Sequence, residues 1–446
     1  MTDKLAIPHW NRREFLGAAA GSAVVAGSVG PLLAADAKAP AAPLREVIGP
    51  VLGHVDHASA HLFCRVPGGL EVTLVLRGLD GQVVSRQTTT SSAAHDFCVP
   101  FAIKDLVPGQ TYRGQLSTSG GTNLFGEENN DGQFTFTTPA APETPATVTL
   151  GLGSCVSSTE FDALWSQIAA QKVEGFCLLG DTPYIDTNDL ARNRAARRKF
   201  WGTLPTLRTL ATQIPFWNTW DDHDFGKNDS DGLMPKKEDI RQAFLEYNAL
   251  ASYGADDAGI YTSFRRGPVE IWLIDDRWFS QTGPSWADPA QKTCLGEAQW
   301  QWLQETLKAS TAPFKILCTG MVWYPKGNKE KDHWETYSAE REAMFAWIKE
   351  QKITGVMLVS GDIHVSRHHT YGPERVGYPL HECVVSPMHA SVIPALDVQH
   401  PARIWSKPEP NVFLKLVATN KGKKPKLTAT WINIKGETIH EFEMGA

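Results

Sequence analysis

Two apolar runs in this chain end in the dipeptide Gly-Asp, at residues 176–181 and at residues 356–362. Short apolar runs of this kind predict buried strands, and a terminal glycine and carboxylate place the carboxylate at the carboxyl-terminal edge of the sheet. Tyr184 follows the first run closely and His364 follows the second. Carboxylate, phenolate and imidazole groups bind hard metal ions, so the sequence predicts a metal site at this edge.

The length and charge of the chain limit the classes of protein to which it can belong. At 446 residues it is longer than one ordinary domain, so two domains are expected. Its composition, 42% hydrophobic and 21% charged, is typical of a globular protein with a buried core. The formal net charge of −6 argues against a scaffold that binds nucleic acid. An anionic substrate is compatible with this charge, because bound metal ions can supply local positive charge.

The amino-terminal region has the pattern of a twin-arginine export signal. Arg12 and Arg13 lie just before an Ala/Gly-rich, moderately apolar stretch over residues 17–35. We therefore expect a signal peptide over residues 1–37, export by the twin-arginine machinery, and a periplasmic or secreted protein. A cytosolic amphipathic start and a membrane anchor are the alternatives, and the Ala/Gly content suits a signal better than a stable span. No other run predicts a transmembrane segment.

The rest of the sequence divides into a β-rich part and an α/β part. Short strand patterns separated by turn residues predict an all-β sandwich of immunoglobulin or fibronectin type over residues 45–139. A Pro-rich linker is expected over residues 140–146. Strand and helix patterns then alternate over residues 147–446, which predicts a layered α/β domain. Within it we expect one helix over residues 192–210 and a closing β-hairpin at the sheet edge.

The seven cysteines are scattered and contain no Cys-x-x-Cys pair, so neither a zinc ribbon nor a thioredoxin-like site is expected. Cys64 and Cys98 either form a disulfide or stay buried thiols. Cys155 follows a predicted strand, at the same sheet edge as the two Gly-Asp segments. It is either a metal-bound thiolate or a small buried hydrophobic residue.

An acidic cluster adds to the predicted metal site. Asp221, Asp222 and Asp224 surround His223 directly after an apolar strand pattern that ends near Trp220. Carboxylates crowded beside a buried strand repel one another unless a cation pairs with them. The sequence therefore favours a metal-binding loop over a solvated acidic loop.

The second Gly-Asp segment offers two ligands on one face. Asp362 and His364 are two residues apart, so an extended backbone points both side chains the same way, within reach of two neighbouring metal ions. By contrast, His368 and His369 are expected to lie in an exposed polar turn.

The four segments, in this order on one α/β domain, resemble the alkaline phosphatase D (PhoD) family of metallophosphoesterases. The likeness extends to residues 49–51, 108–112, 273–277, 295–300 and 382–387, and it covers nearly everything after the signal. The resemblance implies a four-layer α/β sandwich of metallophosphoesterase type, preceded by a β domain like the amino-terminal domain of that family.

The resemblance also implies a dinuclear centre that contains a ferric ion and a divalent ion, calcium in the better-known members. The implied metal ligands are Cys155, Tyr184 and His364 for the ferric ion, Asp181 as the bridge, and Asp222, Asp362, Asp221 and Asn228 for the divalent ion. The implied catalytic residues are His223, which would face the substrate phosphate, and Arg277, which would support the site.

A site of this kind predicts hydrolysis of phosphodiesters, phosphomonoesters or both by a metal-activated hydroxide. Behind an export signal, we expect this activity to supply phosphate to the cell. Two alternatives stay open: cleavage of lipid phosphodiesters in the manner of phospholipase D, and a non-catalytic binding protein built on the β-sandwich. Trp278, Trp286, Trp323 and Trp334 lie in predicted loops, where they either contact a lipid or, as we favour, pack inside the protein.

Overall fold

The computed structural model describes residues 46–119, 124–157 and 161–446. The twin-arginine signal predicted over residues 1–37 lies outside these described residues and stays a prediction. Within the described ranges, none of the helices combines the length and the apolar character needed to cross a bilayer.

The first seven strands of the described chain form two antiparallel sheets. The three-stranded sheet has the order β1 (Ile48–Val55), β2 (Ala60–Arg65), β5 (Cys98–Ile103). The four-stranded sheet has the order β4 (Val83–Thr90), β3 (Glu71–Gly78), β6 (Thr111–Thr118), β7 (Gln133–Thr137). Exposed and buried residues alternate along β7, and the buried faces of both sheets share one apolar cluster. That this all-β region is a sandwich of immunoglobulin or fibronectin type stays a prediction.

Two larger sheets follow. The six-stranded sheet has the order β10 (Phe216–Thr219), β9 (Phe176–Leu179), β8 (Thr147–Gly153), β18 (Val412–Thr419), β19 (Lys426–Asn433), β20 (Thr438–Gly445). The seven-stranded sheet has the order β11 (Thr262–Arg266), β12 (Val269–Leu273), β13 (Phe314–Cys318), β14 (Val356–Ser360), β16 (Leu380–Val384), β15 (Ser366–Tyr371), β17 (Arg403–Lys407). The runs β10–β9–β8 and β12–β13–β14–β16 are parallel. The predicted hairpin at the sheet edge is confirmed as β19–β20.

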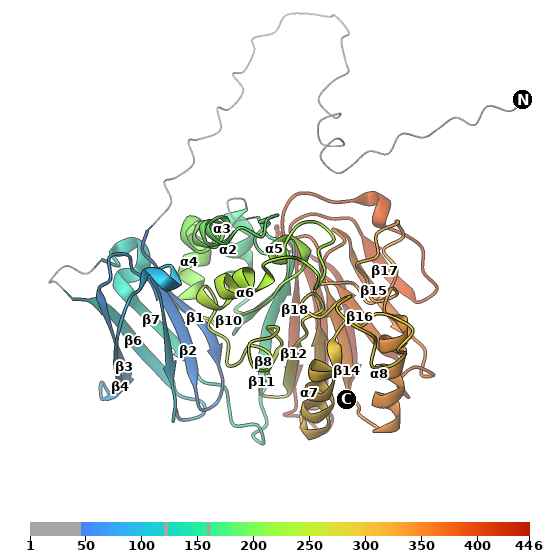
Figure 1. Ribbon diagram of the computed structural model, residues 1–446. Helices are drawn as coiled ribbons and strands as arrows, with labels where there is room; N and C mark the ends of the chain where they lie inside the picture. Colours follow the sequence, from blue (N-terminus) through green and yellow to red (C-terminus); the bar gives the residue numbers. More distant parts are fainter. Residues whose placement is uncertain (1–45, 120–123, 158–160) are drawn as a thin grey trace, which may run out of the picture. The chain divides into compact units, whose positions relative to one another are not determined.

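The helices within residues 162–211 lie on the outer face of the six-stranded sheet, and those at 296–309 and 338–350 lie on the outer face of the seven-stranded sheet (Figure 1). The α-helices of the described residues are α2 (Asp162–Ala170), α3 (Leu190–Thr203), α4 (Pro205–Ala211), α5 (Asp222–Phe225), α6 (Lys237–Glu246), α7 (Gly296–Ala309) and α8 (Ser338–Glu350). Short 3-10 helices occur at η1 (Ala93–His95), η2 (Glu127–Gly132) and η3 (Pro394–Leu396).

The alternation of strand side chains divides the α/β region into four layers. Leu179 of β9 and Met357 of β14 belong to one core cluster that fills the space between the two large sheets. Leu178 of β9 packs instead with residues of α2, α3 and α4, and Leu358 of β14 packs with residues of α7 and α8. Since successive strand residues face opposite ways, each large sheet is covered on both faces. The result is a helix–sheet–sheet–helix arrangement, an α/β fold as predicted.

The helix predicted over residues 192–210 is two helices. α3 ends at Thr203, and α4 begins at Pro205. Leu204 between them has φ −84° and ψ 119°, an extended conformation. Proline lacks an N–H and crowds the residue before it out of the helical region, so the helix breaks there.

The prediction that His368 and His369 lie in an exposed turn is wrong. Both belong to β15, and each is 2% exposed. Nδ1 of His369 lies 3.0 Å from Oε2 of Glu382, and Nε2 of His368 lies 3.0 Å from Nδ1 of His381. These polar contacts on the neighbouring strand β16 offset the cost of burying two imidazoles.

Candidate metal centre

The loops after the parallel strands bring the candidate ligands together at one edge of the two large sheets. Cys155 follows β8, Asp181 follows β9, Asp222 begins α5 after β10, and Asp362 and His364 follow β14. These strands carry the residues to a shared edge because they run in parallel within each sheet.

Glycine at both Gly-Asp segments allows these loops to touch. Gly180 has a φ of +85°, and a Cβ atom there would lie 2.4 Å from Cβ of Asp221. A Cβ atom on Gly361 would lie 2.4 Å from Cβ of Ser154. Both distances are too short for carbon atoms, so a side chain at either position would push the loops apart.

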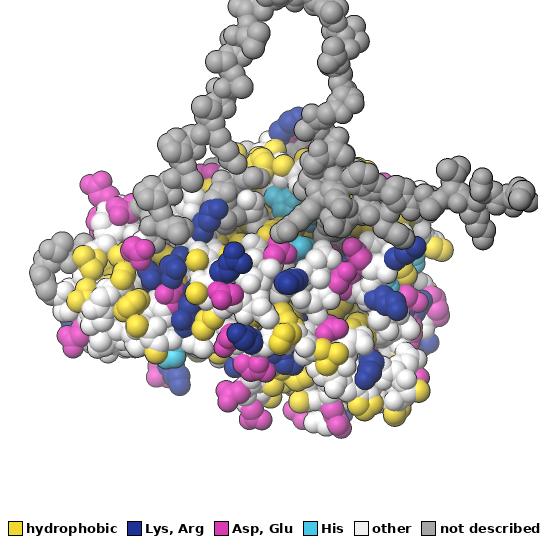
Figure 2. All heavy atoms as spheres, turned by 45° about the horizontal axis from the view of Figure 1, so that its top comes forward, with side chains coloured by type: hydrophobic (Ala, Val, Ile, Leu, Met, Phe, Trp, Pro, Cys, Tyr) yellow, Lys and Arg dark blue, Asp and Glu magenta, His cyan; other side chains and the backbone are white. Residues whose placement is uncertain are grey.

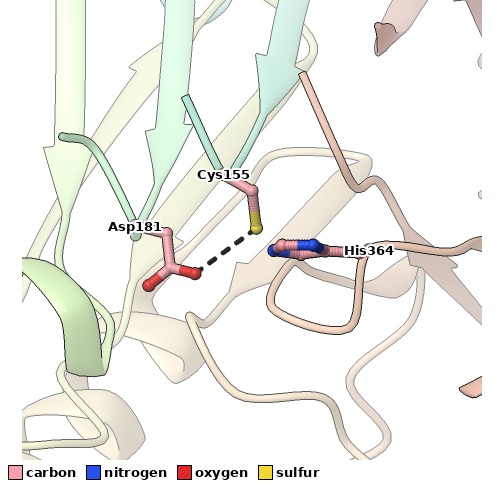
Figure 3. A group of neighbouring side chains, drawn as sticks. All are labelled: Cys155, Asp181 and His364. Atoms are coloured by element: carbon pink, nitrogen blue, oxygen red, sulfur yellow. Dashed lines mark hydrogen bonds between the residues drawn. The ribbon is translucent and has the colours of Figure 1, made fainter. Parts of the chain in front are cut away.

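Cys155, Asp181 and His364 form the first group of possible ligands. The cysteine sulfur, a carboxylate oxygen and a ring nitrogen all lie within 4.8 Å of one another, and the three residues are buried. Figure 3 shows the three side chains converging from separate loops, with Sγ of Cys155 3.5 Å from Oδ2 of Asp181. One ion at their centre would be bound by thiolate, carboxylate and imidazole together.

Tyr184 joins this group through His364. Its hydroxyl lies 2.7 Å from Nε2 of His364 and 3.1 Å from Nε2 of His389, which follows β16. Burial raises the pKa of the Cys155 thiol and of the Tyr184 phenol, and the charge of Asp181 raises both pKa values further. A bound cation would act in the opposite direction, since it stabilises a thiolate and a phenolate.

Four of the candidate ligands have left-handed backbone conformations. The φ angle is 57° at Cys155, 53° at Asp181, 67° at Asp362 and 54° at His364. Aspartate and histidine are the more tolerant of this region, whereas cysteine seldom adopts it. Residues held in such conformations cluster at functional sites, where the surrounding structure fixes them.

The carboxylates of the acidic cluster have different partners. Asp224 accepts hydrogen bonds from the backbone N–H groups of Asp181 and Asp221, at 3.2 and 2.7 Å. It therefore ties the loop after β9 to the loop after β10. These backbone hydrogen bonds relieve part of the charge crowding in the cluster. They give Asp224 a structural role instead of the role of a metal ligand.

Asp222 is the member of the cluster that faces Asp181. The two carboxylates form a second group of possible ligands with His223, again within 4.8 Å of one another. Burial alone would raise the pKa of Asp222, but the charges of Arg277 and His223 hold it below its ordinary value. Since Asp181 belongs to both groups, the structure places it where one carboxylate can bridge two ions.

Arg277 and Asp221 form a buried ion pair behind this centre. Nε of Arg277 donates to Oδ1 of Asp221 at 2.6 Å, and Nη2 donates to the same oxygen. Nη2 also lies 3.3 Å from Oδ2 of Asp332 and 4.0 Å from Oδ1 of Asp222. The arginine side chain is 1% exposed. The structure therefore favours a positioning role for Arg277 over contact with a substrate.

The predicted ligand Asn228 lies on the surface, in the loop after α5. Its neighbour Asp229, also exposed, forms a third group of possible ligands with Asp222 and Asp332. Asp362 is 5% exposed, and burial raises its pKa to about 7 although a neighbouring lysine opposes the shift. The acidic side of the centre therefore contains more carboxylates than the sequence predicts.

His223 lies beside Asp181 and Asp222 and is 8% exposed. Its Nδ1 lies 2.6 Å from Oδ1 of Asp186, and its ring centre is 4.7 Å from that of Tyr184. Burial lowers the pKa of His223, but the charge of Asp181 and the hydrogen bond to Asp186 raise it to about 10. Without bound metal ions, these contacts favour the protonated form of His223. Figure 2 shows histidine side chains near the middle of the face turned toward the viewer.

Sequence reasoning missed five residues here: Asp186, Asp229, Lys326, Asp332 and His389. Asp186 comes shortly after Tyr184, and His389 comes shortly after the segment over residues 382–387. A search just beyond these segments would therefore have found both. Asp229 lies next to the predicted Asn228. Lys326 and Asp332 belong to the long loop between β13 and α8, where the sequence carries no comparable signal.

The loop tryptophans pack inside the protein, as favoured from the sequence. Trp278 is 6% exposed, and Trp323 and Trp334 are fully buried. Trp286 is partly buried and stacks on Trp300, with ring centres 4.2 Å apart. These four side chains therefore provide little surface for a lipid.

The model of the PhoD-like phosphatase family matches residues 151–420 of this chain, which include all of the candidate ligands. Alkaline phosphatase D of Bacillus subtilis (strain 168) is 25% identical over 206 residues. That alignment covers 39% of this chain, and it spans about a third of the relative, 35% of its length.

Two solved structures have a similar fold. A structure of PhoD superposes with a TM-score of 0.73 at 17% identity, covering 90% of each chain. The purple acid phosphatase PPD1 from seeds of yellow lupin (Lupinus luteus) superposes with a TM-score of 0.67 at 11% identity, covering 90% of this chain and 74% of that one. With the family match over more than half of its length, the chain belongs to the PhoD-like phosphatase family, a family of phosphoric ester hydrolases.

Proposed function

We propose that the protein is an exported, metal-dependent phosphoesterase that hydrolyses phosphodiesters, phosphomonoesters or both at a dinuclear centre. The observation that carries the proposal is the pair of ligand groups that share Asp181, one with Cys155 and His364 and the other with Asp222 and His223. Two adjacent ligand groups with one common carboxylate are the arrangement that a pair of bridged cations requires.

The donor atoms fit two different ions. Cys155, Tyr184 and His364 offer a thiolate, a phenolate and an imidazole, and such anionic donors suit a ferric ion. Asp222 and Asp362 offer only carboxylate oxygens, which suit a hard divalent cation such as Ca²⁺. The preference for iron and calcium rests on this donor chemistry and on the family resemblance.

When bound, the two ions would polarise the phosphoryl group and lower the pKa of the attacking water. The chain's own contribution is to orient these groups. Asp181 and Asp222 fix the spacing of the two sides, and Asp224 holds their loops together through two backbone hydrogen bonds. Arg277 keeps Asp221 and Asp332 in place. The ligands therefore need little rearrangement when substrate binds.

His223 is the group that we assign to the leaving oxygen of the ester. Its contacts with Asp181 and Asp186 favour the protonated form, and its Nδ1 lies 2.6 Å from Oδ1 of Asp186. A histidine fixed in this way can donate a proton to an alkoxide as it leaves, or stabilise the charge that develops there.

We infer export from the twin-arginine pattern around Arg12 and Arg13, and a role in phosphate acquisition from that pattern together with the metal-ligand set. The export route carries folded proteins, so the metal ions can be inserted before the protein crosses the membrane.

The test is a parallel assay of aryl phosphate monoesters and diesters with the purified, metal-loaded protein. We expect turnover of at least one class, and loss of turnover in Asp181→Asn. Asp131→Asn, in η2 of the all-β region, serves as the matched control. A protein that contains both ions and hydrolyses neither class would refute the proposal.

A further inference from the structure

We propose that the ammonium group of Lys326 takes the place of a cation on the acidic side of the centre, and so limits this side to one divalent ion. The inference rests on the proposed function, because it concerns the same metal centre. It adds a residue that sets how many ions the centre holds.

Lys326 is buried between two carboxylates. Its Nζ lies 2.6 Å from Oδ2 of Asp362 and 2.7 Å from Oδ1 of Asp332, and its side chain is 2% exposed. Calcium–oxygen distances in proteins are about 2.3–2.6 Å, so the ammonium lies almost as close to these oxygens as a calcium ion would. It also carries the positive charge that a buried pair of carboxylates needs.

Asp332 shows why this place is filled. Its Oδ1 faces Lys326, and its Oδ2 lies 3.3 Å from Nη2 of Arg277. Both oxygens of the carboxylate therefore face a positive side chain of the protein. Asp332 can form a ligand group with Asp222 and Asp229. Each of its two oxygens already faces a cationic side chain, however, so neither is left for a metal ion.

Asp362 is limited in a different way. Lys326 holds its Oδ2, so that this carboxylate can offer an ion only its other oxygen. A second divalent ion beside Lys326 would also meet the repulsion of the ammonium at close range. The divalent ion is thereby confined to the part of the centre near Asp181 and Asp222.

Solvent reaches this region through a surface hollow of about 400 Å³. Asp229, Arg277 and Asp332 are among its lining residues, and so is Lys329, an exposed lysine on the same loop as Lys326. A hydrated divalent ion can therefore approach the acidic side, and what keeps an additional ion out is the charge already present. Lys329 provides a matched control, because it has the same charge but lies outside the carboxylate pair.

The experiment counts bound metal. Wild-type protein and the variants Lys326→Met and Lys329→Met are dialysed against Ca²⁺, and the ions per chain are measured by mass spectrometry of the elements. We expect Lys326→Met to bind one more Ca²⁺ per chain than the wild type, and Lys329→Met to match the wild type. The double variant Lys326→Met/Asp332→Asn should return to the wild-type count, because it lacks the carboxylate that the extra ion needs.

If the wild type and Lys326→Met bind the same number of Ca²⁺ ions, the inference is overturned and the proposed dinuclear centre is unaffected. If the wild type binds no metal, both the inference and the proposed function are overturned. If Lys326→Met does not fold, wild-type crystals soaked in Mn²⁺ decide the matter by anomalous diffraction. The absence of a peak within bonding distance of both Asp332 and Asp362 supports the inference, and a peak there overturns it.

Discussion

Arg277 and Asp221 form an ion pair that is almost completely shielded from water. Nε of the arginine lies 2.6 Å from Oδ1 of the aspartate, and each side chain is 1% exposed. A buried charge without its partner is costly, so the pair couples the loop after β12 to the start of α5. The position of Asp222, the next residue in α5, depends on this coupling.

The first prediction concerns the stability of this pair. Arg277→Met should lower the free energy of unfolding by about 3–5 kcal/mol, because Asp221 would be left buried and unpaired. Urea denaturation monitored by tryptophan fluorescence measures the loss. Arg375→Met, which breaks a partly exposed pair with Glu342, should cost much less. Removing both charges, in Arg277→Met/Asp221→Asn, should restore part of the stability. An unchanged midpoint in Arg277→Met would contradict the role of the pair.

The second prediction concerns His223. His223→Ala should lower kcat by about 10²–10⁴-fold, the usual contribution of a positioned general acid. Asp186→Asn should retain more activity but shift the alkaline limb of the kcat profile to lower pH, because the hydrogen bond that Nδ1 of His223 donates to Asp186 helps to raise the pKa of His223 to about 10. The readout is kcat from pH 6 to 10. If the alkaline limb of Asp186→Asn lies at the same pH as that of the wild type, the contact between Asp186 and His223 is not what raises the pKa of His223.

The sequence predicted the parts of this site that follow strands. Asp181 and Asp362 were found because an apolar run, a glycine and a carboxylate together mark the end of a buried strand. The end of an apolar strand pattern also marked the cluster around Asp222, and it left Cys155 open between a metal-bound thiolate and a buried hydrophobic residue. Such signals are carried by neighbouring residues, so they can be read without knowledge of the fold.

Lys326 and Asp332 could not be predicted in this way. They lie in the loop between β13 and α8, and their partners Asp362 and Arg277 come from the ends of β14 and β12. Only the tertiary structure brings these charges together. The sequence of the loop, which contains exposed lysines such as Lys329, is typical of a solvated surface segment.

His368 and His369 show a second limit of sequence reasoning. A polar run such as theirs usually lies in a turn, yet here it forms an interior strand between β16 and β17. Burial is tolerated because partners such as His381 and Glu382 come from the adjacent strand. Local polarity predicts exposure only where such partners are absent.

The third prediction concerns the proposed ligands of the ferric ion. His364→Ala should lose iron and activity together, and Tyr184→Phe should lose the visible absorption band expected of a phenolate bound to Fe³⁺. Elemental analysis and absorption spectra of the purified protein measure both. His381→Asn, in β16, is the control for a histidine away from the centre and should keep the iron and the colour. Iron retained at the wild-type level in His364→Ala would refute its assignment as a ligand.

The last prediction concerns the stability of the metal-free protein as pH changes. Burial raises the pKa values of Asp181, Asp224, Asp276 and Asp362 to about 7 in the folded protein, against an ordinary value near 3.8. The folded state therefore binds more protons than the unfolded state between these values, and its stability falls as pH rises from about 4 through 7. The melting temperature of the metal-free protein should accordingly be higher at pH 5 than at pH 8. Bound cations offset the buried negative charge of Asp181 and Asp362, so the metal-loaded protein should lose much less between the same two pH values. A metal-free protein that melts at the same or a higher temperature at pH 8 would show that these carboxylates are already ionised at low cost.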